Sequence, residues 1–156
     1  MQCSDAGKAF IKRWEVLELV EYLDAAGLPT IGYGHRLAHS GMYPNGITQE
    51  QADQSLAEDL APVEVHWNSV LAFHGQQSLH QHEFDALCSF AFNVGIPAAM
   101  QSTLCLQVCR GDLAAAADEF LKWDHITVNG TKVVSEGLLH RRQAELALFK
   151  GDTTWT

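Results

Sequence analysis

The segment 79–94 is the most apolar part of the chain, and it limits the possible folds more than any other segment. It reads LHQHEFDALCSFAFNV, with apolar residues on too many sides for a helix that lies on a protein surface. Such a helix is buried only when other helices pack around it. The sequence therefore predicts a central core helix over 79–94, ended by Gly95-Ile96-Pro97.

The first part of the chain changes from a helical to an extended pattern. Residues 4–15 carry apolar side chains three and four apart, which predicts a helix. Residues 17–35 alternate apolar and polar positions and interleave β-branched and aromatic residues with glycine. This pattern favours short antiparallel strands. An extended loop is expected over 36–47, where glycine, proline and asparagine are frequent.

From Thr48 onward the chain is expected to be helical. A capping box at 48–51 begins a long amphipathic helix that reaches about residue 72. Pro62 lies within this helix and predicts a kink or a helix restart, because it removes a backbone hydrogen bond. Further helices are expected over 101–109, 113–123 and 138–149, with turns at Gly111 and Asn129-Gly130.

These patterns predict an α+β fold in which a small antiparallel β-sheet lobe follows an N-terminal helix. A long helix joins this lobe to a larger all-helical lobe. A chain of 156 residues fits a single domain over 1–156. The β-lobe is expected over about 16–47, and the helical lobe over about 73–150 together with the N-terminal helix.

The composition excludes several classes of partner. With 19 acidic and 10 basic residues the net charge is −9, and no nucleic-acid partner is expected because phosphate binding needs clustered Lys and Arg. No apolar run approaches the roughly 18 residues of a membrane span. The N-terminus lacks a signal-peptide pattern, so synthesis in the cytoplasm is expected.

The run His80-Gln81-His82-Glu83 is the most metal-like cluster in the sequence. It is better explained as a polar helix start, because no further ligand follows at helical spacing. We therefore expect no metal site and no cofactor.

Three polar residues stand where the predicted sheet begins: Glu15 ends the first helix, Asp24 lies in a turn and Thr30 opens a strand. Glycoside hydrolysis needs one carboxyl group that donates a proton and a second that stays charged. A hydroxyl group between them could hold the attacking water. From the spacing alone the commoner explanation is structural, since Asp is frequent in turns and Thr in strands.

The surrounding residues resemble the phage-type lysozymes, or endolysins, of glycoside hydrolase family 24. The family's Glu, Asp and Thr occur at the same two spacings, and its hexapeptide TIGYGH stands unchanged at 30–35. The resemblance extends from about residue 10 to residue 150. Further matches follow in the family's order: Ile47-Thr48 with Glu50-Gln51-Ala52, Ser89 to Gly95, Ser102-Thr103-Leu104, Gly137-Leu138, Arg141-Arg142 and Ala144-Glu145.

The resemblance implies a lysozyme-like fold and a muramidase. Such an enzyme hydrolyses the β-1,4 bond between N-acetylmuramic acid and N-acetylglucosamine in a peptidoglycan glycan strand. By the same resemblance Glu15 is the general acid, and Asp24 and Thr30 position or activate the water. Asp24 could instead stabilise positive charge that develops on the sugar.

Four further residues match positions that support the site in relatives. His35 and Asp59 match a pair that joins the two lobes, and Arg141 matches an arginine near the catalytic glutamate. Asn93 matches a polar residue that faces the cleft. It either binds an N-acetyl sugar or only caps the helix that ends there.

The segment after Glu15 departs from the family pattern. The glutamate is usually followed by glycine and then by a strand with Arg or Lys, whereas this chain has Val16, Glu18 and Glu21. If residue 16 needs a positive φ, valine is strained there by about 1–3 kcal/mol. The two extra carboxylates add negative potential near Glu15. An alternative function is therefore a non-catalytic relative that binds peptidoglycan or has a structural role.

The resemblance also suggests how the protein works in the cell. An endolysin of this kind is expected to be a monomer that acts on the cell wall after release. It would depend on a separate holin for access to the wall. A toxin used between bacteria would share the same chemistry and differ only in its delivery.

Overall fold

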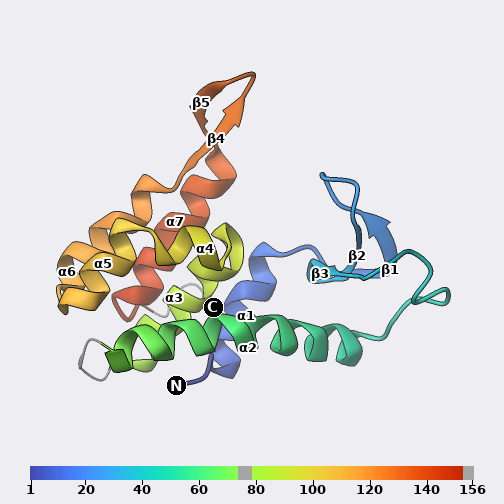
Figure 1. Cartoon of the computed structure of the whole chain (residues 1–156), viewed down its shortest axis with the longest axis horizontal. Coiled ribbons are helices and arrows are strands. Elements are labelled where there is room, and N and C mark those ends of the chain that lie inside the picture. The colour runs from blue at the N-terminus through green and yellow to red at the C-terminus, as the bar shows by residue number, and fades with distance from the viewer. Residues whose placement is uncertain (74–78, 153–156) are drawn as a thin grey trace.

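The computed structural model describes residues 1–73 and 79–152 of the chain. Strands β1 to β3 form a lobe near one end of the long helix α2, and most of the other helices gather toward its other end (Figure 1). In chain order the elements are α1 (Asp5–Trp14), β1 (Glu18–Leu23), β2 (Pro29–Gly32), β3 (His35–Arg36), α2 (Gln49–Phe73), α3 (Gln81–Val94), α4 (Ile96–Met100), α5 (Thr103–Arg110), α6 (Leu113–Glu119), the 3-10 helix η1 (Phe120–Lys122), β4 (His125–Val128), β5 (Thr131–Val134) and α7 (Glu136–Phe149).

The strands β1, β2 and β3 form an antiparallel sheet in that order, as the extended pattern predicts. Tyr22 of β1 lies opposite Thr30 of β2, and Thr30 lies opposite Arg36 of β3. The turn between β1 and β2 closes through the N–H of Asp24, which donates to the carbonyl oxygen of Leu28 at 2.9 Å. The sheet thus holds Asp24 and Thr30 in one local unit.

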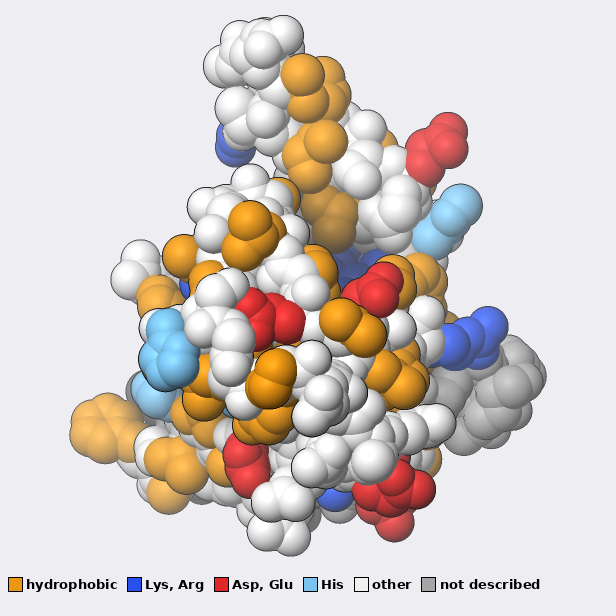
Figure 2. All heavy atoms as spheres, turned by 90° about the vertical axis from the view of Figure 1, so that its right-hand side faces the viewer, with side chains coloured by type: hydrophobic (Ala, Val, Ile, Leu, Met, Phe, Trp, Pro, Cys, Tyr) orange, Lys and Arg blue, Asp and Glu red, His pale blue; other side chains and the backbone are white. Residues whose placement is uncertain are grey.

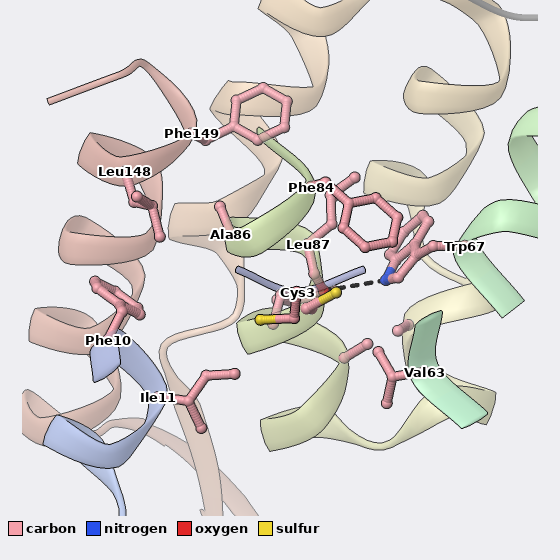
Figure 3. Packing of buried hydrophobic residues seen from close by; sticks show 14 of the residues in the cluster. Cys3, Phe10, Ile11, Val63, Trp67, Phe84, Ala86, Leu87, Leu148 and Phe149 are labelled. Atoms are coloured by element: carbon pink, nitrogen blue, oxygen red, sulfur yellow. Dashed lines mark hydrogen bonds between the residues drawn. The ribbon is translucent and has the colours of Figure 1, made fainter. Parts of the chain in front are cut away.

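Helix α3 lies at the centre of the helical lobe, and all its residues from Glu83 to Ala91 are buried. It packs against α1, α2 and α7. Phe10 and Ile11 of α1 belong to the same core, and Trp67 of α2 donates its indole N–H to the carbonyl oxygen of Leu87 at 3.1 Å (Figure 3). The predicted central core helix is confirmed.

Helix α2 continues through Pro62 without interruption, so the predicted helix restart is wrong. A proline inside a helix costs about 3 kcal/mol. On both sides of Pro62, however, the helix buries Leu60, Val63 and Trp67 almost completely. Each such side chain contributes about 1.5–3 kcal/mol on burial, which is enough to offset the proline.

The larger lobe is not all-helical, because β4 and β5 form an antiparallel hairpin before α7 (Figure 1). Asn129 and Gly130 at its tip have φ angles of 49° and 78°. Two consecutive positive φ angles are what a type I′ hairpin turn requires, and Asn-Gly is a preferred pair for it. The turn is visible in the sequence. The missed signal is the β-branched residues on both sides of it, Ile126-Thr127-Val128 and Val133-Val134.

Gly95 ends α3, as the sequence predicts, but another short helix follows it directly. Pro97 lies in the first turn of α4, where its missing N–H costs nothing. The segment Gly95-Ile96-Pro97 is therefore a junction between two helices, and Gly95 and Ile96 form part of the wall of a cleft.

Val16 does not have a positive φ, because Asn129 is the one non-glycine residue with that geometry in the described part of the chain. The turn from α1 to β1 is made instead by Glu15, which has extended dihedral angles of −100° and 133°. The predicted strain at Val16 is therefore wrong, and valine fits this position.

One face of the molecule shows how its positive charges are distributed. On the face shown in Figure 2, Lys and Arg side chains are few and lie apart from one another. Within residues 1–73 and 79–152, no helix combines the length and the apolar character needed to cross a membrane.

Candidate active site

A cleft of about 690 Å³ lies between the β-lobe and the helical lobe. Pockets of roughly 300–1,000 Å³ are typical of sites that bind small ligands. The β-lobe, the middle of α2 and the junction of α3 with α4 provide its walls. The lining residues are Glu15, Tyr33, Gly34, Arg36, Asp59, Val63, Ala91, Phe92, Asn93, Val94, Gly95 and Ile96.

Glu15 stands at the end of α1, where the helix gives way to the sheet. Its N–H donates to the carbonyl oxygen of Ile11 at 3.2 Å, which completes the last helical turn. The Glu15 side chain is 23% exposed and accepts a hydrogen bond from Nη1 of Arg141 at 2.7 Å. Glu15 is thus a partly buried carboxyl group that faces the cleft and has one cationic partner.

Asp24 lies in the turn between β1 and β2, and this turn holds it as a charged group. Its Oδ1 accepts hydrogen bonds from the N–H groups of Ala26 and Leu28 at 2.8 and 2.9 Å. The Leu28 N–H is the largest cause that lowers the pKa of Asp24, and Arg36 lowers it further. Nη2 of Arg36 lies 3.5 Å from Oδ2 of Asp24.

Thr30 is buried, and its hydroxyl group donates to the carbonyl oxygen of Leu28 at 2.9 Å. Neither Thr30 nor Asp24 is among the residues that line the cleft. Arg36 connects Thr30 and Asp24 to the cleft. This arginine lines the cleft, lies opposite Thr30 in the sheet and forms an ion pair with Asp24.

Tyr22, which no sequence motif marks, experiences the negative charges of both Glu15 and Asp24. Burial is the largest cause that raises the pKa of Tyr22. The negative charges of Glu18, Asp24 and Glu15 raise this pKa further, in that order. Glu15 and Asp24 therefore both act on the same phenol group.

His35 and Asp59 form a contact between the β-lobe and α2. Nδ1 of His35 lies 3.0 Å from both carboxylate oxygens of Asp59. Both side chains are partly exposed, and Asp59 lines the cleft. The pair fixes β3 relative to the long helix.

Arg141 of α7 lies beneath Glu15 and is buried. Besides Glu15 it contacts Glu145, with 3.1 Å between Nε of the arginine and Oε1 of the glutamate. Ser89 of α3 donates its hydroxyl group to the same Oε1 at 2.8 Å. Burial is the largest cause that raises the pKa of Glu145, and the charges of Arg142 and Arg141 oppose this shift.

Arg142, the next residue of the same helix, contacts another residue that lines the cleft. Its Nη2 donates to Oδ1 of Asn93 at 2.6 Å, and its guanidinium group lies 5.3 Å from the ring centre of Phe90. Burial is the main cause that lowers the pKa of Arg142. Its Nη1 lies 3.2 Å from Oε2 of Glu145, an ion-pair distance without hydrogen-bond geometry.

The carboxylate of Glu21 is held by hydrogen bonds from the loop that follows β3. Its carboxylate accepts hydrogen bonds from the hydroxyl group of Ser40 and from the N–H of Gly41, the latter at 2.8 Å. These hydrogen bonds lower the pKa of Glu21, with Ser40 as the largest cause. Glu21 thus holds the loop that follows β3, whereas Glu18 is exposed.

The histidine-rich start of α3 has a structural explanation. The side chain of Glu83 accepts a hydrogen bond from the N–H of His80 at 2.7 Å, which caps the helix. Nδ1 of His82 lies 3.1 Å from the carbonyl oxygen of Phe149. No group of three or more potential metal ligands of the His, Cys, Asp or Glu type occurs among the described residues.

Comparison with known proteins identifies the family. Residues 12–145 match the phage lysozyme family. The chain is 42% identical to an endolysin from Acyrthosiphon pisum secondary endosymbiont phage 1, with 96% of this chain and 99% of that protein covered. It is 38% identical to an endolysin from Salmonella phage P22, with 96% and 98% covered. Its structure is similar to that of an endolysin from Escherichia coli O157:H7 phage FAHEc1, with a TM-score of 0.82, 38% identity, and 96% and 93% covered. The chain belongs to the phage lysozyme family.

Proposed function

We propose that this enzyme, a glycoside hydrolase by its family, uses Glu15 as the general acid that cleaves the glycan strand of peptidoglycan. The bond cut is the β-1,4 bond between N-acetylmuramic acid and N-acetylglucosamine. The observation that carries the proposal is the position of Glu15, which lies partly buried on the cleft wall and is held by Arg141 at 2.7 Å. The relatives that are endolysins support peptidoglycan as the substrate.

In the proposed step Glu15 gives its proton to the glycosidic oxygen as the bond from that oxygen to the anomeric carbon breaks. A water molecule adds to the anomeric carbon and loses its proton to Asp24. Asp24 suits this role because its hydrogen bonds keep it ionised. The hydroxyl group of Thr30 donates to a backbone carbonyl, so its oxygen stays available to accept a hydrogen bond from that water.

The other expected site residues receive supporting roles in this proposal. Asn93 would bind an N-acetyl group, because it lines the cleft and its Oδ1 is already held by Arg142. The pair His35–Asp59 would hold the two walls of the cleft together. Helix capping is the less favoured role for Asn93, since the cap of α3 is made by Gly95.

The proposal is tested by replacing Glu15 with Gln, which keeps the shape of the side chain but has no acidic proton to donate. Lysis of a suspension of purified peptidoglycan should fall on the order of 10²–10⁴-fold. The matched control is Glu18→Gln, which removes an exposed carboxylate three residues away. Near-wild-type lysis by folded Glu15→Gln protein would show that Glu15 is not the acid.

The same assay decides the non-catalytic alternative. The wild-type protein should lyse the wall at some pH between about 4.5 and 7.5, where a carboxylic acid and a carboxylate can coexist. No lysis across this range by protein with an intact circular dichroism spectrum would favour a relative that binds peptidoglycan without cutting it.

We further propose that the protein is a monomer made in the cytoplasm that reaches the wall through a separate holin. Its similarity to phage endolysins supports this route. The N-terminal segment is itself part of the enzyme, because Cys3, Phe10 and Ile11 are buried in the core. Expression with and without a holin should show lysis of the producing cell only when both are present, and lysis without the holin would contradict this route.

A further inference from the structure

The buried ion network under the cleft contains a residue, Glu145, that the proposed reaction does not use. Glu145 is fully buried on α7, between that helix and α3. Its Oε1 accepts hydrogen bonds from Ser89 at 2.8 Å and from Nε of Arg141 at 3.1 Å. Its Oε2 lies 3.2 Å from Nη1 of Arg142. One carboxylate therefore faces two buried guanidinium groups.

The far ends of the two arginines contact two different residues that line the cleft. Nη1 of Arg141 donates to Glu15 at 2.7 Å, and Nη2 of Arg142 donates to Asn93 at 2.6 Å. Both Glu15 and Asn93 line the cleft. Glu145 is thus connected to Glu15 through Arg141 and to Asn93 through Arg142.

We infer that Glu145 is a positioning residue. Its carboxylate pairs with both Arg141 and Arg142 and so fixes both Glu15 and Asn93 for catalysis. This inference rests on the proposed role of Glu15 as the general acid. Glu145 does not touch the cleft itself, and it acts only through the two arginines.

The charge balance gives the direction of its effect. Arg141 forms ion pairs with two carboxylates among the described residues, Glu145 and Glu15. The negative charge of Glu145 offsets part of the effect that the positive charge of Arg141 has on Glu15. Without the charge of Glu145, the full charge of Arg141 acts on Glu15 and favours its ionised form, which cannot donate a proton. Without Arg142, its positive charge no longer offsets the negative charge of Glu145. The protonated form of Glu15 is then favoured.

The other charged groups around Glu15 are unchanged by these substitutions. Arg36 and Asp59 line the same cleft, and Glu15, Glu18 and Asp24 all act on Tyr22. They contribute equally to the pH dependence of wild type and variants. A difference between the profiles therefore reports on the network formed by Arg141, Arg142 and Glu145.

The test compares Glu145→Gln with Arg142→Met by measuring kcat/KM for peptidoglycan hydrolysis against pH. The alkaline limb of this profile reports the general acid. It should move to lower pH by roughly half a unit or more in Glu145→Gln and to higher pH in Arg142→Met. KM should also rise in Arg142→Met, because Asn93 loses its partner. Structural damage alone would lower activity in both variants without opposite shifts.

The matched control is Glu119→Gln, which removes another buried glutamate that pairs with Lys122, and neither of these residues lines the cleft. Its profile should superimpose on that of the wild type. Unshifted limbs in folded Glu145→Gln and Arg142→Met, or shifts in the same direction, would overturn the inference.

Removing one partner from a buried ion network is strongly destabilising, so Glu145→Gln could fail to fold. In that case the upward shift in Arg142→Met decides alone, and its absence overturns the inference. A loss of activity in Glu15→Gln combined with unshifted limbs would remove only the role of Glu145. Full activity of Glu15→Gln would instead remove the proposed function.

Discussion

At the scale of single residues, Arg36 links the β-lobe carboxylate to the cleft. It forms an ion pair with Asp24, lies opposite Thr30 in the sheet and lines the same cleft as Glu15. The pKa of Asp24 is lowered mainly by the N–H of Leu28, and Arg36 adds a smaller effect. The charge on Asp24 thus depends first on the turn and second on the arginine.

Replacing Arg36 with Gln should raise the pKa of Asp24 but leave it below its ordinary value of 3.8, because the backbone donors remain. A lowered pKa stabilises the folded state above the unfolded pKa, and this contribution is lost as the pH falls through the folded value. The variant should therefore lose less stability on acidification than the wild type. An NMR titration of the Asp24 carboxyl group measures the shift.

The control for this titration is Arg110→Gln, which removes an exposed arginine at the end of α5. It should leave the pKa of Asp24 unchanged. An unchanged pKa in Arg36→Gln, or an equal rise in the control, would contradict the role given to Arg36.

The family resemblance, rather than spacing alone, made the candidate residues predictable from the sequence. Glu15, Asp24 and Thr30 fall within sixteen positions of one another. Glu145 was not predictable as a site residue, because its contact with Ser89 joins positions 56 apart and depends on how α3 packs against α7. The contact between Arg141 and Glu15 spans 126 positions and came only from the family resemblance.

At the scale of elements, the hairpin of β4 and β5 depends on its two-residue turn. A Cβ atom at Gly130 would meet no atom within 4 Å, so its φ of 78° is the main reason for glycine there. Gly130→Ala should therefore destabilise the protein by about 1 kcal/mol through backbone strain alone. Thermal unfolding followed by circular dichroism measures this loss.

The matched control is Gly137→Ala in the first turn of α7, where the new methyl group would lie 3.9 Å from Oγ of Ser135. Alanine is a better helix former than glycine, so this variant should be neutral or more stable by up to about 1 kcal/mol. Equal melting temperatures for the two variants would contradict the strain assigned to Gly130.

The elements differ in how far the sequence predicts them. Helix α3 was predictable because burial on all sides leaves a continuous apolar segment. The hairpin was missed because its strands are exposed and so have no buried face to produce alternation. The continuity of α2 through Pro62 was not predictable either, since it depends on the residues that the helix buries against the core.

At the scale of the whole molecule, the net charge of −9 opposes binding to an anionic cell wall. On the face shown in Figure 2, the Lys and Arg side chains are few and lie apart from one another. Salt screens repulsion between exposed charges, since the Debye length falls from about 30 Å at 0.01 M to about 8 Å at 0.15 M. Activity at pH 7 should therefore rise roughly twofold or more over this range.

This salt response is measured as the rate of lysis of purified walls in sodium chloride. A basic lysozyme on the same walls is the control and should respond in the opposite direction. A fall in the rate for this acidic enzyme would show that net charge does not limit its encounter with the wall.

The proposed reaction hydrolyses the bond on the reducing side of N-acetylmuramic acid, with Glu15 as the acid. Mass spectrometry of purified peptidoglycan digested in ¹⁸O-labelled water identifies the bond that is cut. The expected products carry a labelled reducing N-acetylmuramic acid, and Glu15→Gln should release them on the order of 10²–10⁴-fold more slowly. Products that end in reducing N-acetylglucosamine, or in an unlabelled anhydro sugar, would contradict it.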